Sequence, residues 1–439
     1  MNPKPTACVI GGGIAGLSSA VFLVNAGFKV RLIEASPKLG GRAYSFFDKT
    51  LNSSIDNGQH IFASWYRDTF EYLKIIGSFD KLTFQKSLEI DFIDLSGKQF
   101  KLKCPDMKPP FHLLYGIMTY DALVLKDKLG IIGFVRKIKA GAFEEKKLKS
   151  MDTAALFEEA GQSGRLIEAF WKPFIIAVFN AEPENTSAYM FVEMIKMGFL
   201  EKGNSELVLP DDYLSNILVD PAEKYLNENG SRVFKTTAVK KLNISDYKID
   251  SLESDSGETV KADYFISAVP FYDFRDLVGS EIFDNEYSNV GNLKYSPILN
   301  VHVKFSSPID NTLKSRFVGI LGATVQWIFK VSVDHLCLVI SSAKELAEKD
   351  KDVIIELCKN ELFKCLPELK NNGITGIRVI KEMRATFVPD NVSLDSRPDN
   401  KTKFSNFFIA GDWTNTGLPS TIEGAVRSAK KCVNEILNK

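Results

Sequence analysis

The chain has 439 residues, enough for two or three domains around a large core, and its 55 basic and 55 acidic residues give a formal charge of zero. This balance excludes a bulk electrostatic attraction to nucleic acid, and a composition that is 45% hydrophobic and 25% charged excludes wholesale disorder. The six cysteines and four histidines lack the spacing of a metal site or a disulfide framework, so we expect no metal and a cytoplasmic location.

The first three elements are typical of a dinucleotide-binding unit. Residues 6–10 predict a buried strand, residues 14–26 a helix rich in small side chains, and residues 29–34 a second strand. Little sequence precedes the first strand, so we expect no export signal. No apolar run approaches the ~20 residues that a membrane-spanning helix needs.

The turn between the first strand and the helix carries the glycines that phosphate binding requires. Gly11 makes a tight turn, Gly13 lets the backbone approach a pyrophosphate, and Gly16 lets the helix pack closely on the strand. The helix N-terminus adds unpaired N–H groups and a partial positive charge. Glu34 ends the second strand, where a carboxylate would hold a ribose. The contacts predicted at the turn are those of Gly11, Gly12, Gly13, Ala15 and Gly16.

Two motifs follow the second strand. In the first, Gly41-Arg42, the arginine can reach a diphosphate or the adenosine end of a long cofactor. In the second, Asp56-Asn57-Gly58-Gln59-His60, the first three residues predict a tight turn because Asn and Gly tolerate positive φ. An aromatic-bearing helix is predicted over residues 65–76.

Residues 109–150 contain a basic amphipathic pattern. Apolar residues recur at helical spacing among lysines and arginines, at Leu125, Leu129, Ile132, Val135 and Ile138. Such a helix either lies on an anionic membrane surface or packs on the core with a solvated basic face. Both interpretations stay open, and we favour the membrane because of the substrate inferred below.

The rest of the chain predicts alternating helices and strands. Helices are expected at 152–161, 165–170 and 189–200, a strand pair at 232–242 and a buried strand at 264–270. Residues 407–412 form an apolar strand that ends in Gly411-Asp412, and 421–426 begin a helix.

This C-terminal pattern resembles the FAD-binding pattern of the flavoprotein family that includes amine oxidases and carotenoid desaturases. The resemblance implies that Gly411 and Asp412 contact the ribityl and pyrophosphate groups and that Val239 lies beside the adenine. It places Thr421, Ile422 and Ala425 near the flavin ring. Since residues 411–425 contain no cysteine, we expect non-covalent FAD.

The implied fold class is mixed α/β. A Rossmann-type FAD-binding domain is discontinuous because its motifs lie at both ends of the chain, and a substrate-binding domain with a sheet and helices is inserted, as in amine oxidases. The expected FAD domain comprises residues 1–80, 205–270 and 385–439, and the substrate domain comprises 81–204 and 271–384.

An ordered set of motifs resembles the hydroxysqualene dehydroxylases more specifically. It runs from the Asp56–His60 block through Trp171-Lys172-Pro173-Phe174 to Gly411-Asp412-Trp413-Thr414 and the helix at 421–426. The departures are Ser420, where the family tends to have Ala, and Ala429, where it often has Gly. Residues 81–150 match poorly.

The resemblance implies removal of the hydroxyl of hydroxysqualene, a C30 isoprenoid alcohol, to give squalene in squalene and hopanoid biosynthesis. Because the alcohol is allylic, acid-assisted loss of water leaves a delocalised cation that a hydride from reduced flavin can quench. The protein would supply orientation, an acid and a dry cavity. We expect a tunnel lined by Phe, Leu and Met with its polar end at the flavin.

The candidate catalytic residues are Asp56, His60 and Arg384. Asp56 and His60 are the candidate acids, because their motif should lie near the flavin ring, and Arg384 could stabilise a flavin anion or the released hydroxide. For each of the three a structural role is the alternative: turn capping for Asp56, a loop hydrogen bond for His60 and an ion pair for Arg384. Gly58 and Gln59 are expected to approach the flavin through backbone and amide groups.

Other functions remain open on the same scaffold: a flavin amine oxidase, a carotenoid-type desaturase or a non-catalytic FAD-bound scaffold. The expected partner is an apolar isoprenoid rather than a nucleic acid. The expected location is cytoplasmic, with peripheral contact at the inner face of a membrane through residues 109–150.

Overall fold

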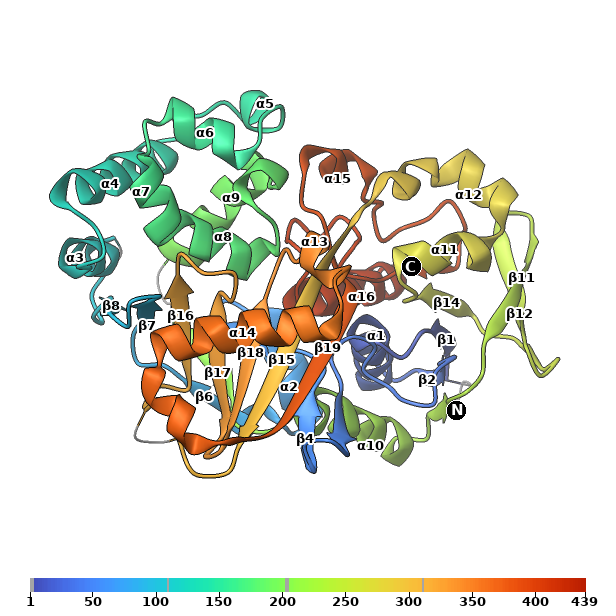
Figure 1. Cartoon of the computed structure of the whole chain (residues 1–439). Helices are drawn as coiled ribbons and strands as arrows, with labels where there is room; N and C mark the ends of the chain where they lie inside the picture. Colours follow the sequence, from blue (N-terminus) through green and yellow to red (C-terminus); the bar gives the residue numbers. More distant parts are fainter. Residues whose placement is uncertain (1–3, 109, 202–204, 310–311) are drawn as a thin grey trace.

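The computed structural model describes residues 4–439 except 109, 202–204 and 310–311 (Figure 1). A five-stranded parallel sheet of order β10-β2-β1-β14-β20 holds strands from the beginning, middle and end of the chain. Its strands are β1 (Thr6–Ile10), β2 (Lys29–Ile33), β10 (Arg232–Phe234), β14 (Tyr264–Ser267) and β20 (Phe407–Ile409). Short apolar runs suit these strands because a parallel sheet is covered on both faces.

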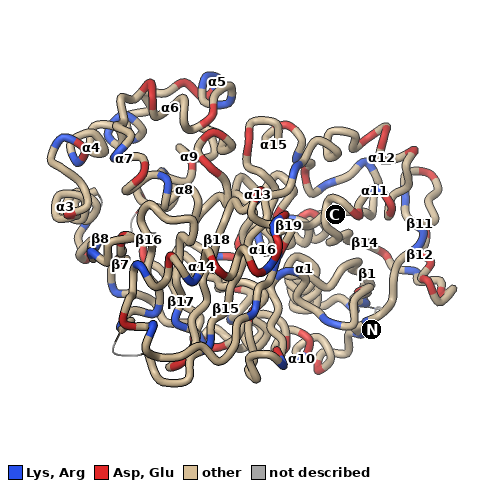
Figure 2. Tube along the Cα trace, viewed as in Figure 1, with Lys and Arg blue, Asp and Glu red and all other residues tan. Residues whose placement is uncertain are grey.

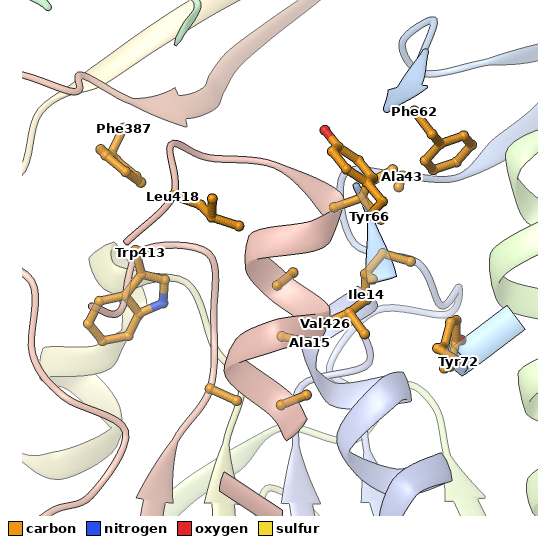
Figure 3. Packing of buried hydrophobic residues seen from close by; sticks show 14 of the residues in the cluster. Ile14, Ala15, Ala43, Phe62, Tyr66, Tyr72, Phe387, Trp413, Leu418 and Val426 are labelled. Atoms are coloured by element: carbon orange, nitrogen blue, oxygen red, sulfur yellow. The ribbon is translucent and has the colours of Figure 1, made fainter. Parts of the chain in front are cut away.

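Helices pack around this sheet. They include α1 (Ile14–Asn25), α2 (Arg67–Ile75), α10 (Asp220–Glu228) and α16 (Ile422–Leu437). Helix α1 contacts β1, β2 and α16, and Ile14 and Ala15 of α1 lie beside Val426 of α16 (Figure 3). A small antiparallel sheet of β11 (Val239–Ser245), β12 (Lys248–Ser254) and β13 (Thr259–Val260) contacts α11 (Phe271–Val278), which is followed by α12 (Ser280–Glu286).

A second, seven-stranded sheet has the order β19-β15-β18-β17-β16-β7-β8. Its strands are β7 (Glu89–Asp94), β8 (Gln99–Lys103), β15 (Tyr295–Phe305), β16 (Phe317–Leu321), β17 (Trp327–Ser332), β18 (His335–Ile340) and β19 (Ile374–Phe387). Helix α14 (Lys351–Cys365) covers one face (Figure 1), and its Ile354 and Leu362 share a core with Leu299 and Val301 of β15. The opposite face is left for the site described below.

A cap of helices sits beside this sheet (Figure 1). It comprises α3 (Phe111–Thr119), α4 (Leu125–Lys139), α5 (Glu145–Leu148), α6 (Thr153–Glu159), α7 (Gly164–Leu166), α8 (Lys172–Phe179) and α9 (Ala188–Ile195). Smaller sheets join β3 (Ser45–Asp48) to β4 (Ser53–Asp56), and β5 (Phe62–Ala63) to β9 (Leu207–Pro210) and β6 (Leu82–Phe84). The remaining helices are α13 (Lys344–Ala347) and α15 (Asn391–Ser396).

The structure confirms the mixed α/β fold, and the first strand, helix and second strand begin where they were predicted. The strand pair predicted at 232–242 is wrong in its pairing, because β10 joins β2 in the parallel sheet whereas β11 pairs with β12. The predicted domain boundaries stay a prediction.

The buried face of helix α4 differs in part from the apolar stripe predicted within residues 109–150. Helix α4 buries Ile131, Phe134 and Ile138, while Leu125 and Leu129 of the predicted stripe are exposed. Of the rest of the predicted stripe, Ile132 and Val135 are partly buried and Ile138 is buried, so the stripe and the buried face overlap only toward the C-terminal end of α4.

Charge and cysteine chemistry are unremarkable. Acidic and basic residues alternate along the trace (Figure 2), and all six cysteines are buried and unpaired. Within the described residues, no cluster of His, Cys, Asp and Glu could hold a metal ion. None of the described helices combines the length and the hydropathy needed to cross a membrane.

Candidate active site

One cavity of about 1230 Å³ connects the parallel sheet to the helical cap. At one end it is lined by the turn after β1 and by Glu34, and at the other by Leu113 of α3 and by Ile131 and Val135 of α4. Of the residues predicted to bind the cofactor, all line this cavity except Gly12 and Gly16. A single space therefore reaches from the cofactor motifs into the part of the chain expected to hold substrate.

Gly11 and Gly16 set the shape of the turn after β1. Gly11 has φ +102°, and its N–H donates to Ile33 O at 2.8 Å. A Cβ on Gly16 would lie 1.8 Å from Gly11 O, so only glycine lets α1 begin this close to the turn. The close packing expected of Gly16 is present, and it leaves the N-terminus of α1 facing the cavity.

The residues around the turn fit a dinucleotide. Gly13 and Gly41 face one another without side chains, since a Cβ on Gly41 would lie 3.1 Å from Gly13 Cα. The Glu34 carboxylate accepts the N–H groups of Gly12 at 2.6 Å and Ser36 at 2.7 Å. A carboxylate oxygen has two acceptor sites, so both oxygens of Glu34 can still accept ribose hydroxyls.

Gln59 also has a side chain that suits a bound cofactor. The Gln59 side chain lines the cavity, and its amide nitrogen is buried without a hydrogen-bond partner among the described residues. Such an orphan donor costs free energy unless a bound group satisfies it. These residues fit FAD, and the assignment of Glu34 to its ribose, of the glycine turn to its diphosphate and of Gln59 to its ring stays a prediction.

Asp412, which lines the cavity, is fixed by two partners. Arg42 Nη2 lies 2.6 Å from Asp412 Oδ1, and the hydroxyl of Ser420 donates to Asp412 Oδ2. Burial would raise the pKa of Asp412, but Arg42 and Ser420 hold it below its usual value. In the sequence Ser420 stands out only as a departure from the family pattern, whereas its bond to Asp412 gives it a structural role.

In the loop of the second motif, residues 57–60 form a polar part of the cavity wall. His60 Nδ1 is 2.9 Å from Gly58 O and donates to it, so the other ring nitrogen carries the lone pair of the neutral imidazole. Burial and the positive charge of Arg42 lower the pKa of His60, with the bond to Gly58 opposing them. His60 lines the cavity, and its Nε2 is available to a hydroxyl group there.

Two side chains that sequence analysis missed hold this loop. Asn300 of β15 donates to Asn57 O at 3.1 Å, and Asn57 Nδ2 donates to Glu382 Oε2 of β19 at 3.1 Å. Asn300 and Glu382 both line the cavity. No local sequence signal marks them, because they reach the loop only through the pairing of β15 with β19.

Asp56 and Arg384 are not among the residues that line the cavity. Asp56 accepts from Ser45 Oγ at 2.6 Å and Leu214 N at 3.0 Å, and burial raises its pKa to about 6. Arg384 is exposed, with its guanidinium 4.3 Å from the centre of the Tyr272 ring. Of the three candidate catalytic residues, only His60 lines the cavity, and a catalytic role for each of the three stays a prediction.

Away from the polar loop the cavity becomes apolar. The open face of the seven-stranded sheet presents Phe317, Trp327, Phe329 and Val339, and the helical cap adds Phe170, Phe174 and Met194. The polar side chains of the sheet, Asn300 and Glu382, lie at the end nearest the 56–60 loop. A long apolar molecule with one polar group fits this gradient.

The comparisons with known proteins agree with this geometry. Residues 14–437 match the family model described as flavin-containing amine oxidoreductase. The chain is 29% identical to hydroxysqualene dehydroxylase of Zymomonas mobilis over 98% of both chains, and 23% identical to zeta-carotene desaturase of Solanum lycopersicum over 100% of this chain and 82% of that one. The crystal structure of an oxidoreductase from Methanosarcina mazei shares the fold, with TM-score 0.74, 17% identity and coverage of 99% and 100%. The chain therefore belongs to the flavin-containing amine oxidoreductase family and is an FAD-dependent oxidoreductase.

Proposed function

We propose that the protein removes the hydroxyl of hydroxysqualene to give squalene. The observation that carries the proposal is the single cavity, in which the polar 56–60 loop is followed by an apolar compartment built from the second sheet and the cap. Relatives named hydroxysqualene dehydroxylase match over 98% of both chains, at higher identity than the carotene desaturases. Burial of a C30 chain at ~25 cal/mol per Å² of apolar surface supplies binding energy without charged contacts.

In this reaction a C–O bond breaks, water leaves, and a C–H bond forms at the same carbon. Reduced FAD, bound non-covalently, would supply the hydride, and Arg42, Asp412 and Glu34 would hold the cofactor. The apolar walls exclude water and orient the chain. His60 Nε2 holds the hydroxyl and, when protonated, delivers the proton that lets water depart.

Product analysis under anaerobic conditions tests the proposal. FAD-loaded protein is reduced with dithionite, freed of excess reductant and mixed with hydroxysqualene. Squalene equal in amount to the reduced flavin is the expected result. If squalene does not form, and oxidised enzyme instead releases hydrogen peroxide from an amine or desaturates a carotene, the proposal is wrong.

We also propose that the outer surface of α3 and the first two turns of α4 rest on a lipid membrane. Among the described residues, eight of the sixteen exposed large hydrophobic side chains fall between positions 107 and 129. They are Met107, Phe111, Leu114, Tyr115, Met118, Val124, Leu125 and Leu129. Lys108 and Lys126 are exposed among them and suit anionic headgroups.

The inner side of α3 supports this proposal. Leu113 and Ile117 line the cavity, while Phe111 and Tyr115 of the same helix are 56% and 52% exposed. An isoprenoid dissolved in the membrane would therefore have one helix between it and the cavity. Flotation with phosphatidylglycerol vesicles should recover the wild type with the lipid and lose the Phe111→Ser/Tyr115→Ser variant. Tyr247→Ser/Val333→Ser, which removes equally exposed apolar side chains elsewhere, is the control.

A further inference from the structure

We propose that Ile131 and Val135 of α4 close the apolar end of the cavity and thereby set the length of isoprenoid chain that the protein accepts. The inference rests on the proposed function for the chemical class of the ligand. It concerns a different part of the cavity from the cofactor turn and the 56–60 loop.

Ile131 and Val135 lie far from the cofactor turn but line the same cavity. Helix α4 lies at the upper left of Figure 1, far from β1 and β2, yet Ile131 and Val135 line the same cavity as Gly11 and Glu34. The two α4 residues are four positions apart, so they share one face of the helix. A chain whose polar group lies at the 56–60 loop reaches α4 only with its far end.

The wall formed by Ile131 and Val135 is backed by packed aromatic rings. Phe134, which lies three residues after Ile131 on the buried face of α4, is packed among the rings of Phe157, Trp171 and Phe191, with centroids 6.0, 5.6 and 6.3 Å away. Gln162 links Trp171 to α4, because its amide group accepts a hydrogen bond from Trp171 Nε1 at 2.9 Å and donates one to Gly130 O at 3.4 Å. Close-packed aromatic side chains have little room to move, so this wall does not shift to admit a longer ligand.

The wall that α3 and α4 contribute is chemically uniform. Their lining residues, Leu113, Ile117, Ile131 and Val135, are all aliphatic. Such a surface discriminates by size alone, and each added or missing carbon group in an apolar pocket changes kcat/KM by roughly tenfold or more. Chain length is therefore the property that α4 can select.

The test compares hydroxysqualene with an analogue that lacks one terminal isoprene unit. Val135→Trp should lower the ratio of kcat/KM for hydroxysqualene over the shorter analogue by at least about tenfold, with flavin content unchanged. Ile132→Trp is the matched control, because Ile132 is a partly exposed aliphatic residue on α4 that does not line the cavity. Its ratio should equal that of the wild type.

Val135→Leu adds less volume and provides the same comparison if the tryptophan variant does not fold. An unchanged ratio in the Val135 variants, or an equal loss with both substrates, overturns the inference. Failure of the proposed function is seen separately, as a wild type that yields no squalene. In that case binding of squalene and its shortened analogue is followed by intrinsic tryptophan fluorescence, because Trp65, Trp171, Trp327 and Trp413 all line the cavity. The variant used is Val135→Leu, which adds no tryptophan; a length preference that it shifts supports the inference, and no shift overturns it.

Discussion

Arg42 and Asp412 are 370 positions apart in the chain, yet their side chains form an ion pair with 2.6 Å between Nη2 and Oδ1. Arg42 Nη1 also donates to Ala385 O at 2.7 Å, at the end of β19. One guanidinium thus connects the segment after β2, the second sheet and the loop after β20. This connection brings the two ends of the chain to the same part of the cavity.

Replacing Arg42 by Met should therefore reduce flavin retention and stability together. The buried Asp412 carboxylate would lose its cation, and breaking such a pair costs about 2–3 kcal/mol when one partner is partly exposed. The flavin-to-protein absorbance ratio and the urea midpoint measure the two effects. Arg31→Met is the control, because Arg31 and Glu258 form an exposed pair whose loss costs under about 1 kcal/mol. Equal behaviour of the two variants would contradict the prediction.

Gly16→Ala should abolish flavin binding without a change in side-chain polarity. The added Cβ would meet Gly11 O at 1.8 Å, which forces α1 away from the turn. Gly133→Ala in α4 is the control, since nothing lies within 4 Å of its added Cβ and alanine is the better helix former. That control should gain about 0.5–1 kcal/mol of stability. A flavin-loaded Gly16→Ala protein would show that the packing is not required.

The first strand, helix and second strand were predictable because steric demands leave local marks. Gly11 and Gly16 are fixed by a positive φ and a close approach, which sequence spacing records directly. Thr421 is similar, because its Oγ1 accepts the N–H of Gly424 as a helix N-cap.

What the sequence did not predict depends on contacts between distant segments. Asn300 and Glu382 reach the site through strand pairing, and Ser420, although it stands between two cofactor motifs, takes its role only from its bond to Asp412. The buried face of α4 was predicted only in part, because Ile138 belongs to the predicted stripe whereas Ile131 and Phe134 do not. Periodicity locates a helix, but the cap decides which of its apolar faces is covered.

The buried histidine pair should make the protein sensitive to acid. His302 Nδ1 lies 3.1 Å from His335 Nε2, and burial is the main cause that lowers their pKa values, to about 3 and about 4. Below pH 6.5 the unfolded chain binds protons at both sites while the folded protein does not, so stability falls as the pH decreases. At pH 5 the loss is about 2 kcal/mol for each histidine. Asp56, with its pKa raised to about 6, acts in the opposite direction and offsets part of it.

Urea unfolding between pH 7.5 and 5 measures this effect. The free energy of unfolding should fall more gently with acid in His335→Gln than in the wild type, because glutamine takes up no proton. Parallel slopes in the two proteins would assign the acid sensitivity to other groups.

His60 should give the reaction its pH dependence. Burial and Arg42 lower its pKa below 6.5, so its protonated fraction decreases about tenfold for each pH unit above that value. If protonated His60 assists departure of water, the single-turnover rate of flavin oxidation by hydroxysqualene should fall as the pH rises from 6 to 8. His60→Asn should keep its flavin, lose about 10²-fold in rate and lose the pH dependence.

His112→Asn is the control, because His112 is a buried histidine that is not among the residues lining the main cavity. A His60→Asn enzyme with the pH slope of the wild type would require a different proton donor, and Glu382 would be the next residue to replace because its carboxylate lines the same polar wall.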